Sequence, residues 1–318
     1  MKITFWGVRG SIPTPLSPAE IYTKIKKVLI LAQGVDISTE EKIKNFLDNL
    51  PLSIRGVYGG NTPCVSVETE GSLIIFDIGS GARLLGYKIL QMPQFKNGGV
   101  IHIFLSHTHW DHIQGLPFFA PAYNKNFKLI FYSPFPDIKE RLSFQQDSKY
   151  FPARLEDIPS VKEFVVLKKE KETITIDKEL KVCWNSLIHP GDSFAYKLAS
   201  KNKSMVYATD TEFYKIDEEF MNTVTKLWKN TDVLIFDAQY TPEEYVNKIS
   251  WGHSSTLMAV DVALKANAKR LVLFHHEPTY TDDFIENTLR RAKEYLNTIE
   301  PTSSLEIITA YEGLTIEI

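Results

Sequence analysis

The chain of 318 residues has 43% hydrophobic and 12% aromatic residues, enough for a large buried core. Its formal net charge is -3, and no stretch concentrates Lys and Arg without interleaved acids, which argues against a surface built for a long nucleic acid. The first residues lack the apolar run and small-residue cleavage site of a signal peptide, and no apolar run is long enough to span a membrane. Cys64 and Cys183 offer no disulfide framework. We therefore expect a cytoplasmic protein without membrane contacts.

The first predicted strand, residues 2–8, is followed by a helix. Ser17 and Glu20 are spaced as an N-cap and its capping-box partner, and Pro18 stands in the first turn, where proline is favoured. An apolar stripe continues at helical spacing and ends near Gly34. This pattern predicts an amphipathic helix whose apolar face needs a partner.

A second helix is predicted before Pro51, because Ser38 and Glu41 repeat the capping-box spacing. The two helices form a predicted hairpin insertion at 16–55 within a single domain of residues 1–318. Three roles are open for the hairpin. It could cap a site, bury its stripe against the other subunit of a homodimer, or pack onto its own domain.

The rest of the chain mixes strand-like runs with a few amphipathic helices. Helices are predicted after the serine pair 254–255 and after Asp282, where apolar residues recur at helical spacing. Runs of β-branched and aromatic residues predict strands at 64–69, 73–79, 100–106, 127–133, 180–188, 204–210, 233–240 and 270–276. Several of these runs are apolar almost throughout, which is typical of strands covered on both faces. The pattern predicts an α/β layered protein.

The stretch LSHTHWDHIQG, directly after one predicted strand, gathers His107, His109, Asp111 and His112 within six residues. Side chains of these types repel one another and lose solvation when gathered, unless something binds them. Imidazole nitrogen and carboxylate oxygen without thiolate suit zinc, manganese or iron. His107 and His109, one residue apart, can reach one ion, and Asp111 with His112 can face a second. Four ligands are too few for two ions, so further His or Asp residues are expected at later strand ends.

Later strand ends supply such residues. His189 and Asp210 each follow an apolar strand, and a third strand ends with His275 and His276. Jointly they complete a set for two metal ions. Two divalent ions about 3.5–4 Å apart lower the pKa of a shared water and neutralise charge in the transition state, so no serine or cysteine nucleophile is needed.

These residues resemble the metallo-β-lactamase-fold metallohydrolases, and the resemblance extends along nearly the whole chain. The segment HTHWDH corresponds to the family signature His-x-His-x-Asp-His, and FDIGSG resembles the Asp-containing motif that precedes it. The resemblance implies a four-layer αβ/βα sandwich of two similar halves, with the metals at one edge of the facing sheets. It also implies that Asp77 orients the site and does not bind metal.

The resemblance further implies a ligand assignment with zinc as the expected metal and manganese or iron as alternatives. The stretch LVLFHHEP aligns with the ribonuclease Z pattern of an apolar strand, His, two residues of any kind and Pro, which selects His275 over His276. The implied ligands are His107, His109 and His189 for one ion, Asp111, His112 and His275 for the other, and Asp210 as the bridge between them.

A proton donor is implied by SWGHSS, which resembles the Gly-His-Ser-Thr motif of ribonuclease Z and related phosphodiesterases. There the histidine, here His253, is implicated in protonating the leaving group. Asp237 stands where those enzymes have the Glu of a His-Glu-Ala-Thr motif, and a carboxylate beside His253 would raise its pKa and fix its tautomer. The expected catalytic set is His253, Asp237 and Asp111, of which Asp111 is also a ligand.

The resemblance implies a phosphodiesterase, and the expected substrate is a cyclic nucleotide or another small phosphodiester. The chain has no Gly/Pro-rich basic arm of the ribonuclease Z kind between residues 115 and 189 or between 210 and 237. The stretches WGVRGSIPTP, YGGNTPCVSVET, GLPFFAPAY and YFPARLEDIP resemble a bacterial and phage group that includes cyclic-nucleotide phosphodiesterases. The alternatives are a ribonuclease Z-like RNA 3′ processing endonuclease, a thioester or lactone hydrolase of the same fold, and a non-catalytic metal-binding protein.

Overall fold

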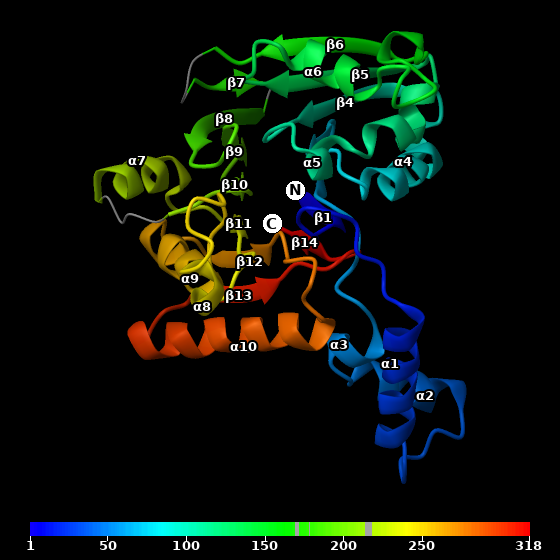
Figure 1. The fold of residues 1–318 in the computed structure, drawn as a ribbon, viewed down its shortest axis with the longest axis vertical. Helices are drawn as coiled ribbons and strands as arrows, with labels where there is room; N and C mark the ends of the chain where they lie inside the picture. The colour runs from blue at the N-terminus through cyan, green and yellow to red at the C-terminus, as the bar shows by residue number, and fades with distance from the viewer. Residues whose placement is uncertain (169–171, 178, 214–217) are drawn as a thin grey trace.

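Two seven-stranded sheets face each other in the protein (Figure 1). The computed structural model describes residues 1–318 except 169–171, 178 and 214–217. In spatial order, the first sheet consists of β14 (Thr315–Glu317), β1 (Lys2–Gly7), β2 (Cys64–Glu68), β3 (Leu73–Phe76), β4 (Gly99–Phe104), β5 (Phe127–Ser133) and β6 (Val161–Val166). The second consists of β13 (Glu306–Thr309), β12 (Arg270–Phe274), β11 (Val233–Asp237), β10 (Lys203–Ala208), β9 (Ser193–Ser200), β8 (Leu180–Leu187) and β7 (Ile174–Thr175).

The two sheets share one pattern of strand directions. In the first sheet, the pairs from β14 to β3 are antiparallel and the pairs from β3 to β6 are parallel. In the second, the pairs from β7 to β10 are antiparallel and those from β10 to β13 are parallel. The parallel strands β5, β11 and β12 are buried along almost their whole length, as their continuous apolar runs predict. The expected sandwich of two similar halves is confirmed.

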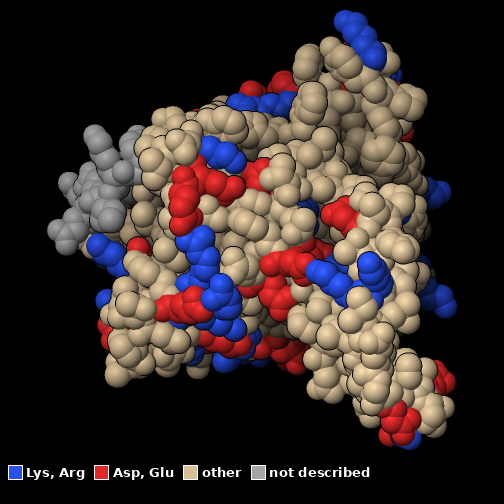
Figure 2. All heavy atoms as spheres, turned by 60° about the horizontal axis from the view of Figure 1, so that its bottom comes forward, with Lys and Arg blue, Asp and Glu red and all other residues tan. Residues whose placement is uncertain are grey.

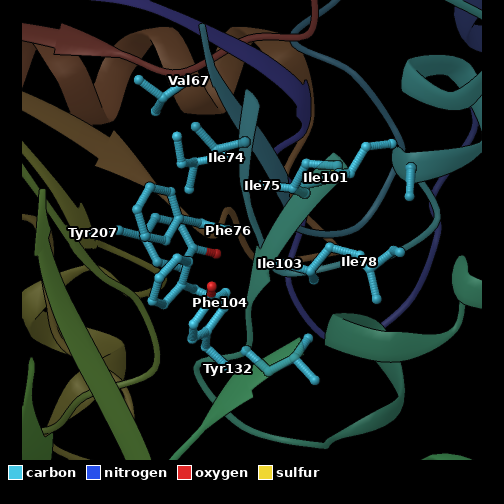
Figure 3. Packing of buried hydrophobic residues seen from close by; sticks show 14 of the residues in the cluster. Val67, Ile74, Ile75, Phe76, Ile78, Ile101, Ile103, Phe104, Tyr132 and Tyr207 are labelled. Atoms are coloured by element: carbon cyan, nitrogen blue, oxygen red, sulfur yellow. The ribbon is translucent and has the colours of Figure 1, made fainter. Parts of the chain in front are cut away.

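The core between the sheets is aromatic. Phe76 of β3 stacks on Tyr207 of β10 with ring centroids 5.3 Å apart, and Phe5 of β1 lies 6.0 Å from Phe274 of β12. Figure 3 shows Phe76, Phe104 and Tyr207 meeting in this layer. Each of these rings buries a large apolar area, so the contacts fix the spacing of the two sheets. The loops at the ends of both sets of strands are thereby held in register.

Helices cover the outer faces of the sheets, with α9 against β11 and β12 and α10 against β13 (Figure 1). The α-helices are α1 (Pro18–Leu31), α2 (Glu40–Asp48), α3 (Leu52–Arg55), α4 (Ala82–Gln91), α5 (Trp110–Ile113), α6 (Ile138–Gln145), α7 (Glu218–Trp228), α8 (Pro242–Tyr245), α9 (Thr256–Lys265) and α10 (Asp282–Ile299). Short 3₁₀ turns are η1 (Pro93–Phe95), η2 (Leu116–Phe118), η3 (Ala120–Tyr123) and η4 (Leu155–Asp157). Among the described residues, every helix is too short or too polar to cross a bilayer.

The expected N-terminal hairpin is present as α1 and α2, which extend from the body of the molecule and away from α5 (Figure 1). The capping box of Ser17 and Glu20 is confirmed at the start of α1. No residue of α1 is buried, although its sequence carries an apolar stripe. In this structure the hairpin neither covers α5 nor buries its stripe on its own domain.

The capping box expected at Ser38 and Glu41 is wrong by one residue. Thr39 is the N-cap of α2, because its backbone is extended and its hydroxyl accepts a hydrogen bond from the backbone N–H of Lys42. The Ser38 hydroxyl instead lies 3.2 Å from the Lys42 ammonium. Both residues are good caps, so the spacing alone could not choose between them.

Candidate metal centre

The seven side chains expected to bind metal converge from separate strand ends. His107 and His109 follow β4, His189 follows β8, Asp210 follows β10 and His275 follows β12. Their ligand atoms form two groups, each with all atoms within 4.8 Å of one another: His107, His109 and His189 in the first group, and Asp111, His112, Asp210 and His275 in the second. The residues that the sequence singled out therefore share one location.

Asp210 lies between the two groups. Its Oδ2 is 3.6 Å from Nε2 of His107 and 3.8 Å from Nε2 of His189. Its Oδ1 is 3.2 Å from Nε2 of His112 and 3.3 Å from Nε2 of His275. Each carboxylate oxygen thus faces one group, which is the geometry of a side chain shared by two cations.

Three site residues occupy left-handed backbone conformations one or two residues after the end of a strand. The φ angles are 55° at Asp77, 53° at Asp210 and 64° at His275. Such angles are uncommon for residues other than glycine and cost about 1–3 kcal/mol each, so they persist only where the surroundings fix them. Asp210 and His275 belong to the second group, and Asp77 contacts its member His112.

The ligand-type histidines other than His109, called the inner histidines below, are oriented by hydrogen bonds between Nδ1 and acceptor atoms of the protein. The pairs are His107 with Ser106 Oγ (3.1 Å), His112 with Asp77 Oδ2 (2.7 Å), His189 with the Gly252 carbonyl (2.8 Å) and His275 with Gln239 Oε1 (3.1 Å). Such partners fix the ring orientation and leave Nε2 free for a metal. Burial and the neighbouring His112 lower the pKa of His107 well below its usual value, which keeps that ring neutral, as a ligand must be.

The Nε2 atoms of His107 and His112 are buried and have no hydrogen-bond partner among the described residues. A buried polar atom without a partner is unfavourable, and here both atoms face a carboxylate oxygen of Asp210. A divalent cation would satisfy all of these atoms at once. The donor set therefore fits metal ions bound by nitrogen and oxygen.

Asp77 stays outside both groups and supports them. Its buried carboxylate accepts hydrogen bonds from the Ser106 backbone N–H (2.7 Å), the Ser106 hydroxyl (2.6 Å) and the Tyr207 hydroxyl (2.8 Å), and it contacts Nδ1 of His112. With its oxygens used in this way, Asp77 holds the loop after β4 in place. These contacts suit the orienting role expected for Asp77, which stays a prediction.

The segment from Arg9 to Ser11 shapes the second group, a role that the sequence did not reveal. The Ser11 backbone N–H donates to Asp111 Oδ2 at 2.7 Å. Gly10 packs so closely on the His275 ring that a Cβ at this position would collide with it. Arg9 is buried and donates hydrogen bonds to the backbone carbonyls of Gly59, Glu277 and Tyr280, so it holds these loops together. The signal in the sequence that could have indicated this role is the Gly10–Ser11 pair shortly after the first strand.

His253 pairs with Asp237 beside the second group. Its Nδ1 is 2.8 Å from Asp237 Oδ2, and the Asp237 carboxylate also accepts from the backbone N–H groups of Thr211 and Gln239, both at 3.1 Å. Burial alone would lower the pKa of His253, but the Asp237 carboxylate raises it above its usual value. The His253 ring stacks on His275 with centroids 5.0 Å apart. These side chains form a third group of ligand type that shares Asp210 and His275 with the second group.

His276 points away from the centre. Its Nε2 bonds to the Ala310 carbonyl at 2.9 Å, and burial together with the nearby Arg9 lowers its pKa to about 3. It is absent from every group of ligand type found among the described residues. The geometry thus favours His275 over its neighbour as the residue directed at the centre.

A buried carboxylate that sequence reasoning missed links two parts of the site. Glu212 accepts hydrogen bonds from the backbone N–H groups of Ser250 (2.8 Å) and Gly252 (2.9 Å). Gly252 in turn offers its carbonyl to Nδ1 of His189 and precedes His253. A Cβ at Gly252 would collide with the His189 ring, and its φ of +85° also favours glycine. Glu212 therefore fixes the loop that positions both histidines.

Solvent reaches the centre through a hollow of about 440 Å³, within the range of roughly 300–1,000 Å³ typical of sites for small ligands. His109 is the exposed member of the first group. The hollow is lined by Ser11, Thr108, His109, Trp110, Asp111, Asp210 and His253. His109 of the first group, Asp111 and Asp210 of the second, and His253 are thus open to one space.

Comparison with known proteins agrees with this geometry. The family described as "Beta-lactamase superfamily domain" matches residues 79–276. The chain belongs to this family. It is a metal-dependent hydrolase of the metallo-β-lactamase fold. The matched region contains all seven side chains of the two groups and the His253–Asp237 pair.

Curated relatives and solved structures extend the comparison beyond the matched region. A ribonuclease Z of Picrophilus torridus is 27% identical over 294 residues, covering 75% of this chain and 87% of the relative. One of Archaeoglobus fulgidus is 26% identical over 286 residues, covering 78% and 92%. Human tRNase Z, short form, superposes with a TM-score of 0.61 at 18% identity, covering 100% of this chain and 99% of that one. Unliganded yeast PDE1 superposes with a TM-score of 0.65 at 13% identity, covering 100% of this chain and 99% of that one. The structural matches support the fold.

Proposed function

We propose that the protein is a binuclear metal-dependent phosphodiesterase that hydrolyses a cyclic nucleotide or another small phosphodiester. The observation that carries this proposal is the pair of ligand groups that meet at Asp210, with His253 and Asp237 beside them. Their donors are nitrogen and carboxylate oxygen, which favours zinc, with manganese or iron as alternatives. When bound, two such ions lower the pKa of a shared water and offset the negative charge that develops on the phosphoryl oxygens.

Each side chain has one part in this proposal. His107, His109 and His189 would hold the first ion, Asp111, His112 and His275 would hold the second, and Asp210 would contribute to both. The Ser11 backbone N–H holds Asp111, and Asp77 holds His112, so that neither ligand needs to reorganise during the reaction.

In this proposal His253 donates the proton that the leaving oxygen needs. Its hydrogen bond to Asp237 uses Nδ1, so Nε2 is the nitrogen that carries the proton to be transferred. Two backbone N–H groups hold the Asp237 carboxylate, which favours the role of an orienting partner over that of a metal ligand. An alkoxide expelled from a phosphodiester gains from a general acid, typically by about 100- to 10,000-fold.

The thioester or lactone hydrolase is a weaker alternative. A thiolate leaves readily without a proton, so a thioesterase would have little use for a buried histidine paired with a carboxylate. A non-catalytic metal-binding protein would not need the His253–Asp237 pair at all. The pair therefore favours phosphodiester hydrolysis over thioester hydrolysis and over a non-catalytic role.

A ribonuclease Z-like function is the second candidate, because the curated relatives named above carry that name. The net charge of -3 and the mixed surface favour a small substrate. Figure 2 shows Lys and Arg interleaved with Asp and Glu over one face of the molecule. Arg291 pairs with Glu243, and Lys27 pairs with Asp283. The segments 115–189 and 210–237, which lack a basic arm in the sequence, include residues 169–171, 178 and 214–217, and these lie outside the described residues.

One panel of assays tests the proposal. Purified protein is analysed for metal and then assayed on cyclic nucleotides, bis(4-nitrophenyl) phosphate, a transfer RNA precursor and a thioester. His253→Ala should lower kcat on cyclic nucleotides by about 100- to 10,000-fold and much less on the nitrophenyl ester, whose leaving group needs no proton. His102→Ala is the matched control, since His102 lies in β4 and contacts Tyr132. Turnover of the thioester alone, unaffected by His253→Ala, would contradict the proposal.

The same proposal includes a homodimer that forms through the hairpin. Ile21, Ile25 and Leu29 of α1 are 47%, 55% and 64% exposed, which is unusual for a contiguous apolar stripe on an isolated chain. A second copy of α1 would bury this stripe. Sedimentation at several concentrations tests it, and a strictly monomeric protein would contradict it. The cytoplasmic location expected from the sequence stays a prediction.

A further inference from the structure

Trp110 is the most exposed large hydrophobic residue among those described, and it lines the hollow at the metal centre. Its side chain is 82% exposed, and it stands between His109 and Asp111 at the start of α5. Tryptophan is large and usually well buried, because leaving an indole in water forfeits much apolar burial. An indole left open beside two ligand-type residues therefore calls for an explanation.

The other four tryptophans all have a partner within the chain. Trp6 donates a hydrogen bond to Ser66, Trp228 donates to Asn185, Trp184 packs against the Phe194 ring at 5.4 Å, and the Lys248 ammonium lies 5.7 Å from the Trp251 ring. The Trp110 indole makes no ring contact and no hydrogen bond with the described residues. Contacts within the fold thus account for Trp6, Trp184 and Trp228. Trp251 is 61% exposed beside a lysine, and Trp110, at 82%, is more exposed still.

We infer that Trp110 is a stacking platform for the base of a nucleotide substrate. This inference rests on the proposed function and narrows it from phosphodiesters in general to those that carry a nucleobase. Trp110 directly follows His109 of the first group and directly precedes Asp111 of the second. A base stacked on its indole therefore leaves the attached phosphate within reach of these two side chains. Every base has a π face, so the platform selects for a base without choosing among bases.

A nucleobase explains the position of the indole better than a protein partner does. The hollow that Trp110 lines also contains His109, Asp111, Asp210 and His253. A second protein chain seated on the indole would cover these side chains and block the site from substrate. A planar ligand that continues into a phosphate fills the same hollow and leaves the reacting groups in contact with it.

Binding measurements separate stacking from catalysis. Calorimetry on the metal-loaded protein compares adenosine 5′-monophosphate with ribose 5-phosphate, which has the sugar and phosphate but no base. Trp110→Ala should weaken binding of the nucleotide by about 5- to 140-fold, the equivalent of ~1–3 kcal/mol, and leave binding of ribose 5-phosphate unchanged. Trp110→Phe should restore most of the affinity. Tyr87→Ala, an exposed aromatic residue on α4, is the matched control and should change neither.

Several results would overturn the inference. One is that Trp110→Ala leaves the affinity for adenosine 5′-monophosphate unaltered. Another is that it lowers the affinities for adenosine 5′-monophosphate and ribose 5-phosphate equally. A third is a wild-type protein that binds the two ligands alike. If Trp110→Ala turns a dimer into a monomer and keeps the nucleotide affinity, Trp110 belongs to a subunit interface and the inference is wrong. If base-dependent binding is present but no phosphodiester is hydrolysed, the proposed function fails and the stacking role stands.

Discussion

The metal centre has buried nitrogen atoms without a hydrogen-bond partner among the described residues, whereas the N-terminal hairpin has apolar side chains exposed to solvent. In the centre, protein acceptors hold the Nδ1 atoms of the inner histidines, and the buried Nε2 atoms of His107 and His112 have no hydrogen bond among the described residues. On α1 no side chain is buried, and apolar residues such as Ile25 and Leu29 face solvent. The unpaired nitrogen atoms of the centre fit cations, whereas the exposed apolar side chains of the hairpin fit another apolar surface.

The largest effect is expected from breaking the centre at His275. His275→Gln should abolish one bound metal equivalent and lower kcat by at least about 100-fold, since even residues that merely orient ligands are worth 10- to 100-fold. His276→Gln is the matched control, because a Gln amide can still donate to the Ala310 carbonyl. Metal analysis and kinetics measure both. Loss of metal from His276→Gln with retention in His275→Gln would reverse the assignment.

A smaller effect is expected from Asp237→Asn, which tests how the centre sets the pKa of His253. The Asp237 carboxylate raises this pKa, so its removal should lower it. A general acid is active only when protonated, and activity is lost as the pH rises through its pKa. The alkaline limb of the kcat profile should therefore move to lower pH in the variant. An unmoved limb would remove His253 from the acid role.

Glu212→Gln should loosen the loop that positions His189. The Gln amide presents an NH2 group where backbone N–H groups now donate, so one of the hydrogen bonds from Ser250 and Gly252 is lost. We expect about a tenfold weaker affinity for one of two metal ions, measured by competition with a chelator. Glu243→Gln, at an exposed ion pair with Arg291, should leave the affinity unchanged. Equal effects of the two variants would contradict a positioning role.

The smallest effect on activity is expected in the hairpin. Ile25→Asp and Leu29→Asp place a charge on exposed positions, so the free energy of unfolding of the monomer should change by no more than about 0.5 kcal/mol. The variants should nevertheless sediment as monomers and keep their turnover per chain. A dimer that survives both changes would show that α1 is not the contact surface.

Much of the centre could be predicted from the sequence because its residues stand at strand ends in compact motifs. His189, Asp210 and His275 each follow an apolar strand, and such strands are recognisable from their composition. The strands β8, β10 and β12 run in the same direction, which brings their carboxyl ends to one edge of the second sheet. The polar residues at these ends were accordingly expected to meet, and they do.

The supporting residues could not be predicted, because their roles exist only in three dimensions. Glu212 contacts a loop 40 residues away, and the Gly10 backbone matters only because the His275 ring packs against it. Strands such as β6 and β9 were missed because their sequences mix polar and apolar residues, so that pairing with neighbouring strands decides their conformation. The shift of the N-cap from Ser38 to Thr39 has the same origin, since both side chains can cap a helix.

Anomalous X-ray diffraction from crystals grown with zinc, with data collected at the zinc edge, tests the central claim most directly. The account predicts two peaks per chain, one among His107, His109 and His189 and the other among Asp111, His112 and His275, with Asp210 between them. A protein saturated with zinc that has a single peak, or peaks away from Asp210, would contradict it.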